Sequence, residues 1–498
     1  MAHTKADSFF HLRAVTIGDQ ACQGTACFLA RHRDPATWER AAHASPRVYC
    51  LGRCFAAPAT AADTGRPHVE VAAPRAVVLD RASAGGAPTF TAYRASGGYQ
   101  ALEQALRLGP SAIVSEIEAS GLRGRGGAAF PAGRKWRAVR DRRAATAYVV
   151  CNADEGDPGA YIDRYLLEDD PHAVLEGLAI VALATGARRG YVYVRKEYPA
   201  ARAAIERAVR EASDEGVLGA RLLGTGPPLD VDVVEGQGSY VCGEETALLN
   251  ALEGRRPEVR ARPPYPSERG LFGAPTVVNN VETLAAVPWI VRHGFGAYRE
   301  MGTDTSPGTK VVSLSSSFRR PGLYEVELGT LVSDIVNNLG GGVADGKLRG
   351  VLVGGPLAGI LPPHLLDTPL DFEAMRRVGC EVGHGGVVAI DEHTSIPELV
   401  HHVFRFGAYE SCGKCTPCRV GAARIEGMFA AALPKAAHTA SHALPALENG
   451  LWETSEHEWR ATVTALAEAS LCGHGTGLAA FARSVMAHYG DEVEQCLA

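Results

Sequence analysis

Short apolar runs of strand length recur between residues 147 and 235, and helical apolar spacing fills the intervals between them. The runs AYVVCNA, GYVYVRKEY and DVDVVEG indicate strands, whereas SAIVSEIEAS, an apolar segment around 172–186 and ARAAIERAVREA indicate helices. Alternation of this kind is typical of an α/β domain with a largely parallel sheet. We therefore expect such a domain over residues 98–305.

The pattern changes on both sides of this region. Residues 1–80 contain short strand-like runs, HVEVA and AVVLD, and 81–97 are rich in Gly, Ala and Ser, which indicates a linker. Over 306–395, KVVSLSS, GLYEVEL and GVLVGG surround one helix, TLVSDIVNNL, as in a small α+β module of about ubiquitin size. Residues 396–498 have helical spacing throughout, for example PELVHHVFRF and WRATVTALAEAS. The sequence thus predicts a multidomain α/β protein.

Composition excludes several classes of protein. The 498 residues are 46% hydrophobic and 21% charged, which is ordinary for a globular chain. A net charge of −6 without a basic run argues against nucleic acid or an anionic membrane as partner. The N-terminus lacks the apolar core of a signal peptide, and VLEGLAIVALATGA (174–187) is too short to span a bilayer. We expect a soluble, cytoplasmic protein.

Twelve cysteines in that setting favour metal or redox chemistry over a disulfide framework. The stretch ESCGKCTPCRVG places Cys412, Cys415 and Cys418 in a C-x2-C-x2-C pattern, which suits a [4Fe–4S] cluster that takes its fourth thiolate from elsewhere. We expect Pro417 to keep this loop from continuing as helix. Cys472 in ASLCGHGTG is the preferred fourth ligand, ahead of Cys496. Zinc, which prefers two separated ligand pairs, is the alternative.

A glycine-rich loop, GLRGRGGAAFPAGRKW (121–136), superficially matches a dinucleotide-binding fingerprint. That fingerprint follows a strand, whereas a helix-like segment precedes this loop, so the standard Rossmann interpretation is poor. Bare backbone amides with Arg123, Arg125 and Lys135 nearby are consistent with phosphate binding. A tight surface loop without a ligand is the alternative.

Two acidic clusters accompany this loop. CNADEGDPGAYIDR places acidic side chains at a strand end, where ligands of open α/β sheets bind. Glu244 and Glu245 lie just before a predicted helix, and their alternative role is to satisfy the helix dipole. Together with the thiolate cluster, these motifs favour a redox cofactor site.

From about residue 98 to 485 these motifs resemble the flavin-bearing, NADH-oxidising subunit of respiratory complex I, which also serves as the diaphorase subunit of NAD-linked formate dehydrogenases and hydrogenases. The resemblance implies FMN in the glycine-rich loop, NADH stacked above it and a [4Fe–4S] cluster that accepts the electrons. It also implies that 306–395 form a β-grasp-like domain without catalytic residues and that 396–498 form the cluster-bearing helical domain.

Site residues follow from the same resemblance, position by position. FMN would be bound by Gly124, Arg125, Gly126, Gly127, Lys135, Asn152, Asp154, Glu155, Tyr240, Gly243, Glu244, Asn279, Asn280 and Thr283. NADH would contact Phe130, Asp157, Glu245, Arg262 and Tyr265. The cluster ligands would be Cys412, Cys415, Cys418 and Cys472. Asp157 and Glu155 are the candidate catalytic residues, because their charges would adjust the electrostatic potential near the nicotinamide.

The sequence departs from the family pattern at several positions. Ala129 stands where the family loop usually has Gly, and Asp157 where it usually has Glu. Arg262 and Tyr265 replace Lys and Phe beside the adenine, and Ala138 replaces an aromatic residue. We expect these changes to retune nucleotide affinity and the choice between NADH and NADPH without changing the reaction.

The N-terminal segments ACQGTACFLA and VYCLGRCFAAP carry Cys22, Cys27, Cys50 and Cys54 in C-x4-C and C-x3-C pairs. They resemble the thioredoxin-like [2Fe–2S] domain of complex I, in a truncated, fused form over residues 1–80. The resemblance implies a second cluster, with zinc or an empty remnant as alternatives.

The implied reaction is hydride transfer between NAD(H) and FMN, followed by single-electron steps through iron–sulfur clusters to or from a partner subunit. The fused N-terminus favours the diaphorase of a formate dehydrogenase, then that of an NAD-reducing hydrogenase, then complex I. That ranking is fold-level analogy. A non-catalytic electron-transfer or scaffold subunit and a zinc-dependent adaptor are the rivals from other classes.

Overall fold

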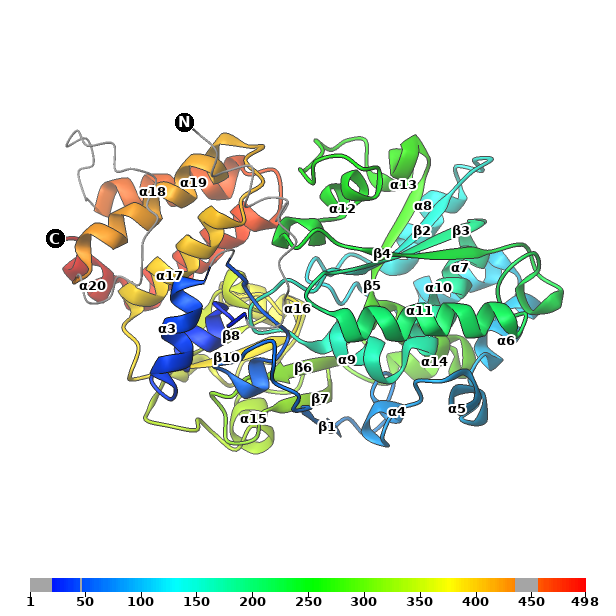
Figure 1. Ribbon diagram of the computed structural model, residues 1–498, viewed down its shortest axis with the longest axis horizontal. Helices are drawn as coiled ribbons and strands as arrows, with labels where there is room; N and C mark the ends of the chain where they lie inside the picture. Colours follow the sequence, from blue (N-terminus) through cyan, green and yellow to red (C-terminus); the bar gives the residue numbers. More distant parts are fainter. Residues whose placement is uncertain (1–19, 45–46, 435–455) are drawn as a thin grey trace.

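The computed structural model describes residues 20–44, 47–434 and 456–498 (Figure 1). Within these ranges the strands form two sheets, one of four strands and one of six. A set of long helices follows the two sheets at the C-terminal end of the chain. No described helix combines the length and the apolar character needed to cross a bilayer.

The four-stranded sheet has the order β4-β3-β2-β5, and all its strands are parallel. Its strands are β2 (Tyr148–Ala153), β3 (Arg189–Val194), β4 (Asp230–Glu235) and β5 (Thr276–Asn280). Three of these were predicted from their apolar runs, and the parallel arrangement is confirmed. β5 was not predicted, because its sequence TVVNN is short and ends in two polar residues.

Helices surround this sheet. They are α6 (Gln100–Leu108), α7 (Pro110–Ser120), α8 (Ala132–Arg140), α9 (Ile162–Asp169), α10 (Pro171–Thr185), α11 (Pro199–Asp214), α12 (Glu245–Leu252), α13 (Pro266–Arg269) and α14 (Val281–Arg299). Every residue of α10 is buried, including His172 and Glu176, which explains why apolar residues occupy all sides of the helix. The helix therefore forms the centre of the main hydrophobic core.

The six-stranded sheet has the order β1-β7-β6-β10-β8-β9. Its strands are β1 (His68–Val71), β6 (Thr309–Leu314), β7 (Gly322–Glu327), β8 (Leu348–Val353), β9 (Ile360–Leu361) and β10 (Gly386–Asp391), with α15 (Val332–Asp334), a π-helical turn (Ile335–Leu339) and α16 (Phe372–Arg377) beside them. Within the described part of residues 1–80, β1 is the one strand. It adds in parallel to β7, so these residues complete the neighbouring module's sheet rather than build their own.

Two local expectations near the N-terminal boundary were wrong. AVVLD was expected to be strand-like, but the backbone amides of Val77, Val78 and Leu79 all donate to the carboxylate of Glu325. The segment expected to be a linker contains α4 (Asp80–Ser83) and α5 (Phe90–Ala95). Its Tyr93 is buried and donates to Glu176 of α10. Arg81 also pairs with Asp170, and the amide of Phe90 donates to Glu211, so this Gly- and Ala-rich segment is packed against the domain.

Short helices precede β1 and long ones end the chain. The former are α2 (Thr25–Leu29) and α3 (Pro35–His43); the latter are α17 (Ile396–Tyr409), α18 (Thr416–Ala432), α19 (Glu456–Ala469) and α20 (Gly473–Leu497). Phe28 of α2 stacks on His402 of α17, with ring centroids 4.1 Å apart, so the N-terminal segment contacts the helical domain (Figure 1). Residues far apart in sequence thus share one core.

Pro417 starts a helix, contrary to the expectation that it would exclude one. It lies in the first turn of α18, where the missing N–H has no helical partner to lose and the fixed φ suits the helix. Cys415 is the N-cap of α18, and Cys418 lies within its first turn. The cysteine loop is therefore half loop and half helix.

Candidate flavin and iron–sulfur sites

The polar residues predicted to bind a ligand gather at the carboxyl edge of the four-stranded sheet. β2 and β5 are neighbours, and Asn152 pairs in register with Asn280. Asp154 follows β2 directly, so its carboxylate lies at the same edge. In open parallel sheets this edge is where ligands bind. The structure thus brings two motifs, 128 residues apart in sequence at that register pair, to one place.

The glycine-rich loop lies against this edge. Its backbone turns back on itself, since Gly124 N donates to Phe130 O at 2.9 Å. A Cβ on Gly126 would be 2.9 Å from Cβ of Asn280, closer than side chains approach. Gly127 has φ of +114°, a conformation that other residues rarely adopt. Both glycines are therefore required for the loop to reach the end of β5.

The cations of this loop differ in where they point. The Arg125 guanidinium is 1% exposed and donates to the backbone oxygens of Thr309 and Pro307, inside the core. Arg123 pairs with Glu373 of α16. Lys135 contacts Glu245 at 3.1 Å and the carbonyl of Val278 at 3.0 Å. Lys135 is thus the loop cation placed at the sheet edge, while the two arginines anchor the loop to the neighbouring module.

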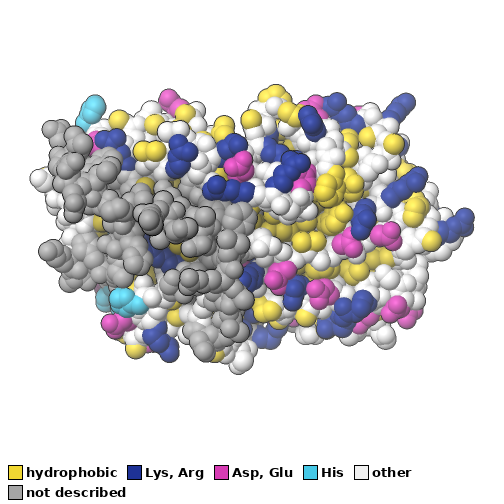
Figure 2. All heavy atoms as spheres, turned by 45° about the horizontal axis from the view of Figure 1, so that its top comes forward, with side chains coloured by type: hydrophobic (Ala, Val, Ile, Leu, Met, Phe, Trp, Pro, Cys, Tyr) yellow, Lys and Arg dark blue, Asp and Glu magenta, His cyan; other side chains and the backbone are white. Residues whose placement is uncertain are grey.

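The residues expected at the NADH side lie on an accessible surface. Phe130 is 49% exposed and Tyr265 53% exposed, which is unusual for large aromatic side chains. Glu245 joins Lys135 and Arg262, whose guanidinium is 3.2 Å from it. On the face that carries α12 and α13, hydrophobic side chains gather in a hollow bordered by charged ones (Figure 2). Exposed rings beside a carboxylate suit a stacked base and a ribose.

Two of the predicted carboxylates act as helix caps. Glu155 accepts from the amides of Ile162 and Asp163 at the start of α9, at 2.6 and 3.0 Å. Glu244 accepts from Thr246 N and Ala247 N at the start of α12, both at 2.9 Å. For Glu244 the structure thus shows the helix-terminus role that the sequence left open.

Other predicted residues hold their neighbours in place. Asn279 accepts from the indole of Trp136 at 2.9 Å. Thr283 Oγ1 accepts from Arg125 N at 2.8 Å. Asn152 donates to Gly243 O at 2.8 Å. Ala129, with φ of +52°, packs in the core of the six-stranded module. Its methyl group therefore contributes to the contact between the loop and that module.

Asp154 and Asp157 each retain a carboxylate oxygen without a hydrogen-bond partner, as does Asp163 nearby. These oxygens, Asp154 Oδ2 and Asp157 Oδ1, are buried. Burial holds the pKa of Asp154 well above its ordinary value and raises the pKa of Asp157 to about 7. A Cβ on Gly355 would overlap the Asp157 carboxylate at 2.0 Å, so this carboxylate is confined. Unpaired buried acceptors indicate room for a donor supplied by a ligand.

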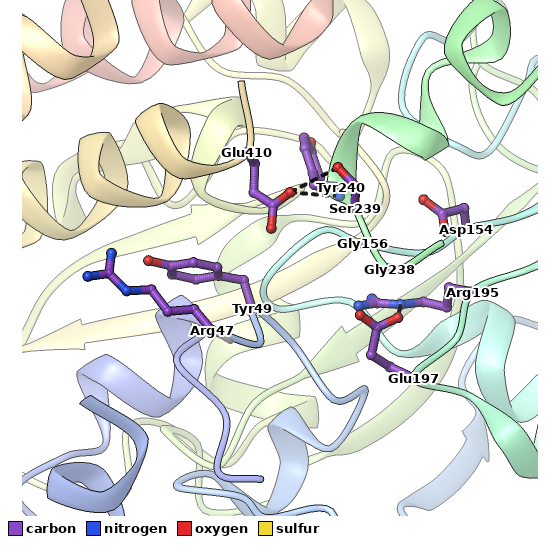
Figure 3. Close-up of a pocket in the computed structure, with 10 residues that line it drawn as sticks. All are labelled: Arg47, Tyr49, Asp154, Gly156, Arg195, Glu197, Gly238, Ser239, Tyr240 and Glu410. Atoms are coloured by element: carbon purple, nitrogen blue, oxygen red, sulfur yellow. Dashed lines mark hydrogen bonds and ion pairs between the residues drawn. The ribbon is translucent and has the colours of Figure 1, made fainter. Parts of the chain in front are cut away.

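A small polar cavity connects three parts of the chain. Its volume is about 10 Å³, the room that one water molecule needs. It is lined by Arg47 and Tyr49, by Asp154, Arg195 and Glu197, and by Glu410. Figure 3 shows the Glu410 carboxylate directed at Ser239 and Tyr240, whose amide donates to it at 2.9 Å. Glu410 thus joins the cysteine loop of the helical domain to the α/β domain.

The four C-terminal cysteines lie near one another, since Cys418 interacts electrostatically with Cys412, Cys415 and Cys472. Cys412 and Cys472 share a buried apolar cluster with Val241 of the α/β domain and Ala247 of α12. Burial raises the pKa of Cys418 to about 12 and that of Cys472 to about 11, and each feels the charge of Cys412. Cys496 lies at the opposite end of α20 from Cys472, which removes it as a ligand candidate.

The four N-terminal cysteines form two close pairs. The sulfurs of Cys50 and Cys54 are 3.6 Å apart. A hydrogen bond from Cys27 lowers the pKa of Cys22 to about 7, and one from Cys54 lowers that of Cys50. All four are at most 3% exposed. In each pair the hydrogen bond between the thiols lowers the pKa of one cysteine and raises that of the other.

The N-terminal pairs lie against the loop that follows β2. Cys50 Sγ is 3.7 Å from Ala160 O. Arg195 donates to the carbonyls of both Cys50 and Glu155. Both cysteine sets therefore contact the α/β domain close to its sheet edge, one through loop 155–160 and the other through Val241.

Sulfur separations distinguish a cluster from a single ion. Four thiolates around one zinc, with bonds of about 2.3 Å, have sulfurs about 3.8 Å apart. Among the residues that the structure describes, no three donors of either cysteine set lie within 4.8 Å of one another. The sulfurs of either set are therefore not gathered as tightly in this structure as the four ligands of one tetrahedral zinc ion.

One buried residue of this region was missed by the sequence analysis. His384, in the turn before β10, lies 3.1 Å from Asp163 and 3.6 Å from Glu155. The only signal in the sequence is a histidine between glycines in VGHGG, which is too common to be interpreted alone. Its neighbours are brought together by tertiary structure.

Comparison with known proteins gives two family matches. Residues 117–289 match the Nuo51 FMN-binding domain, and residues 398–496 match the NADH-ubiquinone oxidoreductase-F iron-sulfur binding region. These are the two regions that carry the glycine-rich loop and the C-terminal cysteines.

Individual relatives agree with these matches. The F 2 subunit of NADH-quinone oxidoreductase from Rhizobium meliloti is 46% identical over 334 residues, 67% of this chain and 79% of the relative. The HndC subunit of NADP-reducing hydrogenase from Solidesulfovibrio fructosivorans is 42% identical over 67% of this chain and 68% of its own. A crystal structure of NAD+-reducing [NiFe]-hydrogenase in the H2-reduced state matches with a TM-score of 0.79 and 30% identity, covering 99% of this chain and 86% of that one.

Proposed function

The chain belongs to the family of FMN- and NADH-binding subunits of NADH-quinone oxidoreductase, and from this premise we propose that it is a diaphorase subunit that moves hydride between NAD(H) and FMN and single electrons through two iron–sulfur centres. One observation supports this proposal most strongly. The glycine-rich loop, the sheet edge and both cysteine sets all contact the same α/β domain. FMN exchanges two electrons with a nicotinamide and one at a time with a cluster.

The residues at the sheet edge fit FMN. A side chain on Gly126 would fill the contact with Asn280, so backbone amides of the loop can approach a phosphate there. Lys135 supplies a cation at the same edge. The unpaired oxygen of Asp154 offers an acceptor for ribityl hydroxyls or ring N–H groups. Gly124, Gly127, Tyr240, Gly243, Asn279 and Thr283 complete the proposed surroundings.

For NADH we propose the exposed surface beside this site. Phe130 would stack on the nicotinamide nucleotide, and Glu245, held between Lys135 and Arg262, would accept from ribose hydroxyls. Tyr265 would lie against the adenine. Asp157 would orient the nicotinamide through its confined carboxylate. Glu155, whose carboxylate lies at the start of α9, would influence the electrostatic potential at the nicotinamide.

For the C-terminal cysteines we propose a [4Fe–4S] cluster held by Cys412, Cys415, Cys418 and Cys472. Tyr240 packs edge-on against Phe406 at 5.1 Å and lies 5.4 Å from His474, so aromatic side chains join the flavin pocket to this site. The cluster supplies one-electron transfer when bound.

For the N-terminal cysteines we propose a [2Fe–2S] cluster. The sulfurs of Cys50 and Cys54 are 3.6 Å apart, within reach of one metal, and Cys22 is hydrogen-bonded to Cys27, so two paired sets of thiols support a two-metal centre. Its position against loop 155–160 supports electron exchange with the flavin.

We propose that the chain divides at the predicted boundaries, into residues 1–80, 81–97, 98–305, 306–395 and 396–498. Residues 81–97 then form a connection that packs against the α/β domain and is not extended. The strand order β7-β6-β10-β8-β9, with the first and last strands of the module parallel at its centre, supports a β-grasp-like fold for 306–395. For residues 1–80 we retain the two cysteine motifs of the predicted thioredoxin-like unit but not its sheet, because β1 belongs to the sheet of the neighbouring module.

For the partner we propose the catalytic subunit of an NAD-dependent formate dehydrogenase, because an N-terminal cysteine module is fused to the diaphorase. A hydrogenase subunit is the second candidate, favoured by the match of 99% of the chain to a hydrogenase structure. We propose the cytoplasm as compartment, since all twelve cysteines are free of disulfides.

Anaerobic purification followed by addition of NADH tests the function. The account predicts bound FMN that NADH bleaches, with ferricyanide as acceptor restoring the colour. Protein without flavin after reconstitution with FMN would contradict the enzyme assignment and favour a scaffold role. Adding formate or hydrogen to the purified native complex separates the two partner candidates.

A further inference from the structure

A buried charged network lies where the six-stranded module meets the sheet edge. Nε2 of His384 is 3.1 Å from Oδ2 of Asp163, and Nδ1 is 3.6 Å from Oε1 of Glu155. Asn280 donates to the same Asp163 oxygen at 2.7 Å. All three charged residues are at most 8% exposed. One imidazole thus bridges two carboxylates that come from α9 and from the loop after β2.

The network touches the elements assigned to FMN. Asn280 is the residue on which Gly126 rests, and Gly127 lies near Gly383, the neighbour of His384. Glu155 caps α9 with the same oxygen that faces His384. Any displacement of the imidazole therefore reaches the glycine-rich loop and the loop that carries Asp157.

We propose that His384 is a positioning residue for the flavin reaction, an imidazolium from the six-stranded module that holds Asp163 and Glu155 in place and compensates their charge beside the flavin. The inference rests on the proposed flavin function and deepens it. It gives the module, to which the sequence assigned no catalytic residue, a part in the redox site.

The electrostatics support an imidazolium. Burial lowers the pKa of His384, but the carboxylates of Asp163 and Glu155 outweigh burial and raise it to about 9. Burial raises the pKa of Glu155 to about 7, and the imidazolium opposes that rise. From β6, Lys310 faces the network, and it is itself paired with Glu282 of α14. Asp157 also feels the charge of His384.

The sign of the pH dependence follows from these directions. A histidine whose folded pKa exceeds its unfolded value stabilises the fold fully below the unfolded pKa, and this stabilisation is lost as pH rises through the folded pKa. The stability difference between wild type and His384→Asn should therefore be largest near pH 6 and narrow between about pH 6.5 and pH 9.

The test compares His384→Asn with His384→Lys and with His364→Asn, an exposed histidine of the same module. His384→Asn should raise the FMN dissociation constant by about tenfold or more, since a buried charged hydrogen bond is lost. It should also shift the flavin midpoint potential to more negative values, because a positive charge beside the reduced flavin is removed. His384→Lys should restore part of the potential, and His364→Asn should match wild type.

Flavin-loaded His384→Asn with unchanged potential, FMN affinity and pH-dependent stability would overturn the inference while leaving the diaphorase function intact. If wild type itself takes up no FMN, the proposed function fails instead. If His384→Asn does not fold, Asp163→Asn can be tested instead. It should lower the pKa of His384, so the pH range over which the protein loses this stabilisation should move to lower values. An unchanged pH range would contradict the proposed network.

Discussion

The two cysteine sets differ in how the chain assembles them. Three of the C-terminal cysteines come from one loop and helix start, and only Cys472 comes from a distant segment. The N-terminal set consists of two sequence pairs that tertiary structure brings together, each pair in sulfur contact or hydrogen bonding. A compact motif can be recognised from spacing alone, whereas a paired site depends on tertiary structure.

The two sets also contact the α/β domain at different points. Cys50 lies against Ala160 in the loop after β2, while Cys412 and Cys472 pack on Val241. With a cluster in each set, as proposed, each would offer the flavin its own route for single electrons. Separate loss of the two centres should have separate consequences.

Removing a C-terminal ligand should have the largest effect. Cys418→Ser should abolish the [4Fe–4S] signal in electron paramagnetic resonance and stop electron delivery to the partner, because no other described thiol can replace it at the start of α18. Reduction of FMN by NADH in stopped flow should persist. Cys496→Ser, at the far end of α20, is the matched control, and loss of the cluster in that variant would contradict the ligand assignment.

Removing an N-terminal ligand should eliminate the other centre alone. Cys54→Ser breaks the 3.6 Å pair with Cys50, so the [2Fe–2S] spectrum should vanish while the [4Fe–4S] signal remains. Cys380→Ser removes a buried thiol of the six-stranded module and serves as control. If Cys54→Ser leaves every spectrum unchanged, these four cysteines are not cluster ligands.

The proposed flavin site should tolerate little crowding at the glycine-rich loop. Gly126→Ala places a Cβ 2.9 Å from Asn280, an overpacking that costs about 1–3 kcal/mol. FMN affinity, measured by fluorescence titration, should fall by roughly tenfold or more. Gly427→Ala, exposed in α18 with open space around it, should leave FMN affinity unchanged. Equal FMN affinity in both variants would mean that the loop does not bind FMN where proposed.

The smallest effect is expected at the nicotinamide. Asp157→Asn keeps the size of a carboxylate confined by Gly355. Because the pKa of Asp157 is about 7, the variant removes its charge above that pH, where kcat for NADH oxidation should fall by roughly tenfold, or about 1.5 kcal/mol. FMN content should stay at the wild-type level. Unchanged steady-state kinetics would remove Asp157 from the reaction.

Much of this fold was predictable because its elements have strong local patterns. The three predicted strands of the parallel sheet and the buried helix α10 appear where the apolar runs place them. The packed segment 81–97 did not, because Tyr93 is buried by a contact with α10 that no local pattern shows. β1 likewise pairs with a strand some 250 residues away in sequence.

The candidate site was predictable to a similar degree. Spacing and family resemblance identified the cysteines and the glycine-rich loop, and the structure brings their surroundings together. The direction of the Arg125 guanidinium into the core and the role of Glu155 as the cap of α9 were not visible, since each depends on which neighbour lies within reach. His384 was missed for the same reason.

The most direct test of the account is the ratio of iron and acid-labile sulfide to FMN in anaerobically purified protein. If the protein holds one four-iron and one two-iron cluster, the ratio should be about six irons and six sulfides per FMN. About four would show that Cys22, Cys27, Cys50 and Cys54 hold no cluster and contradict the second route for electrons.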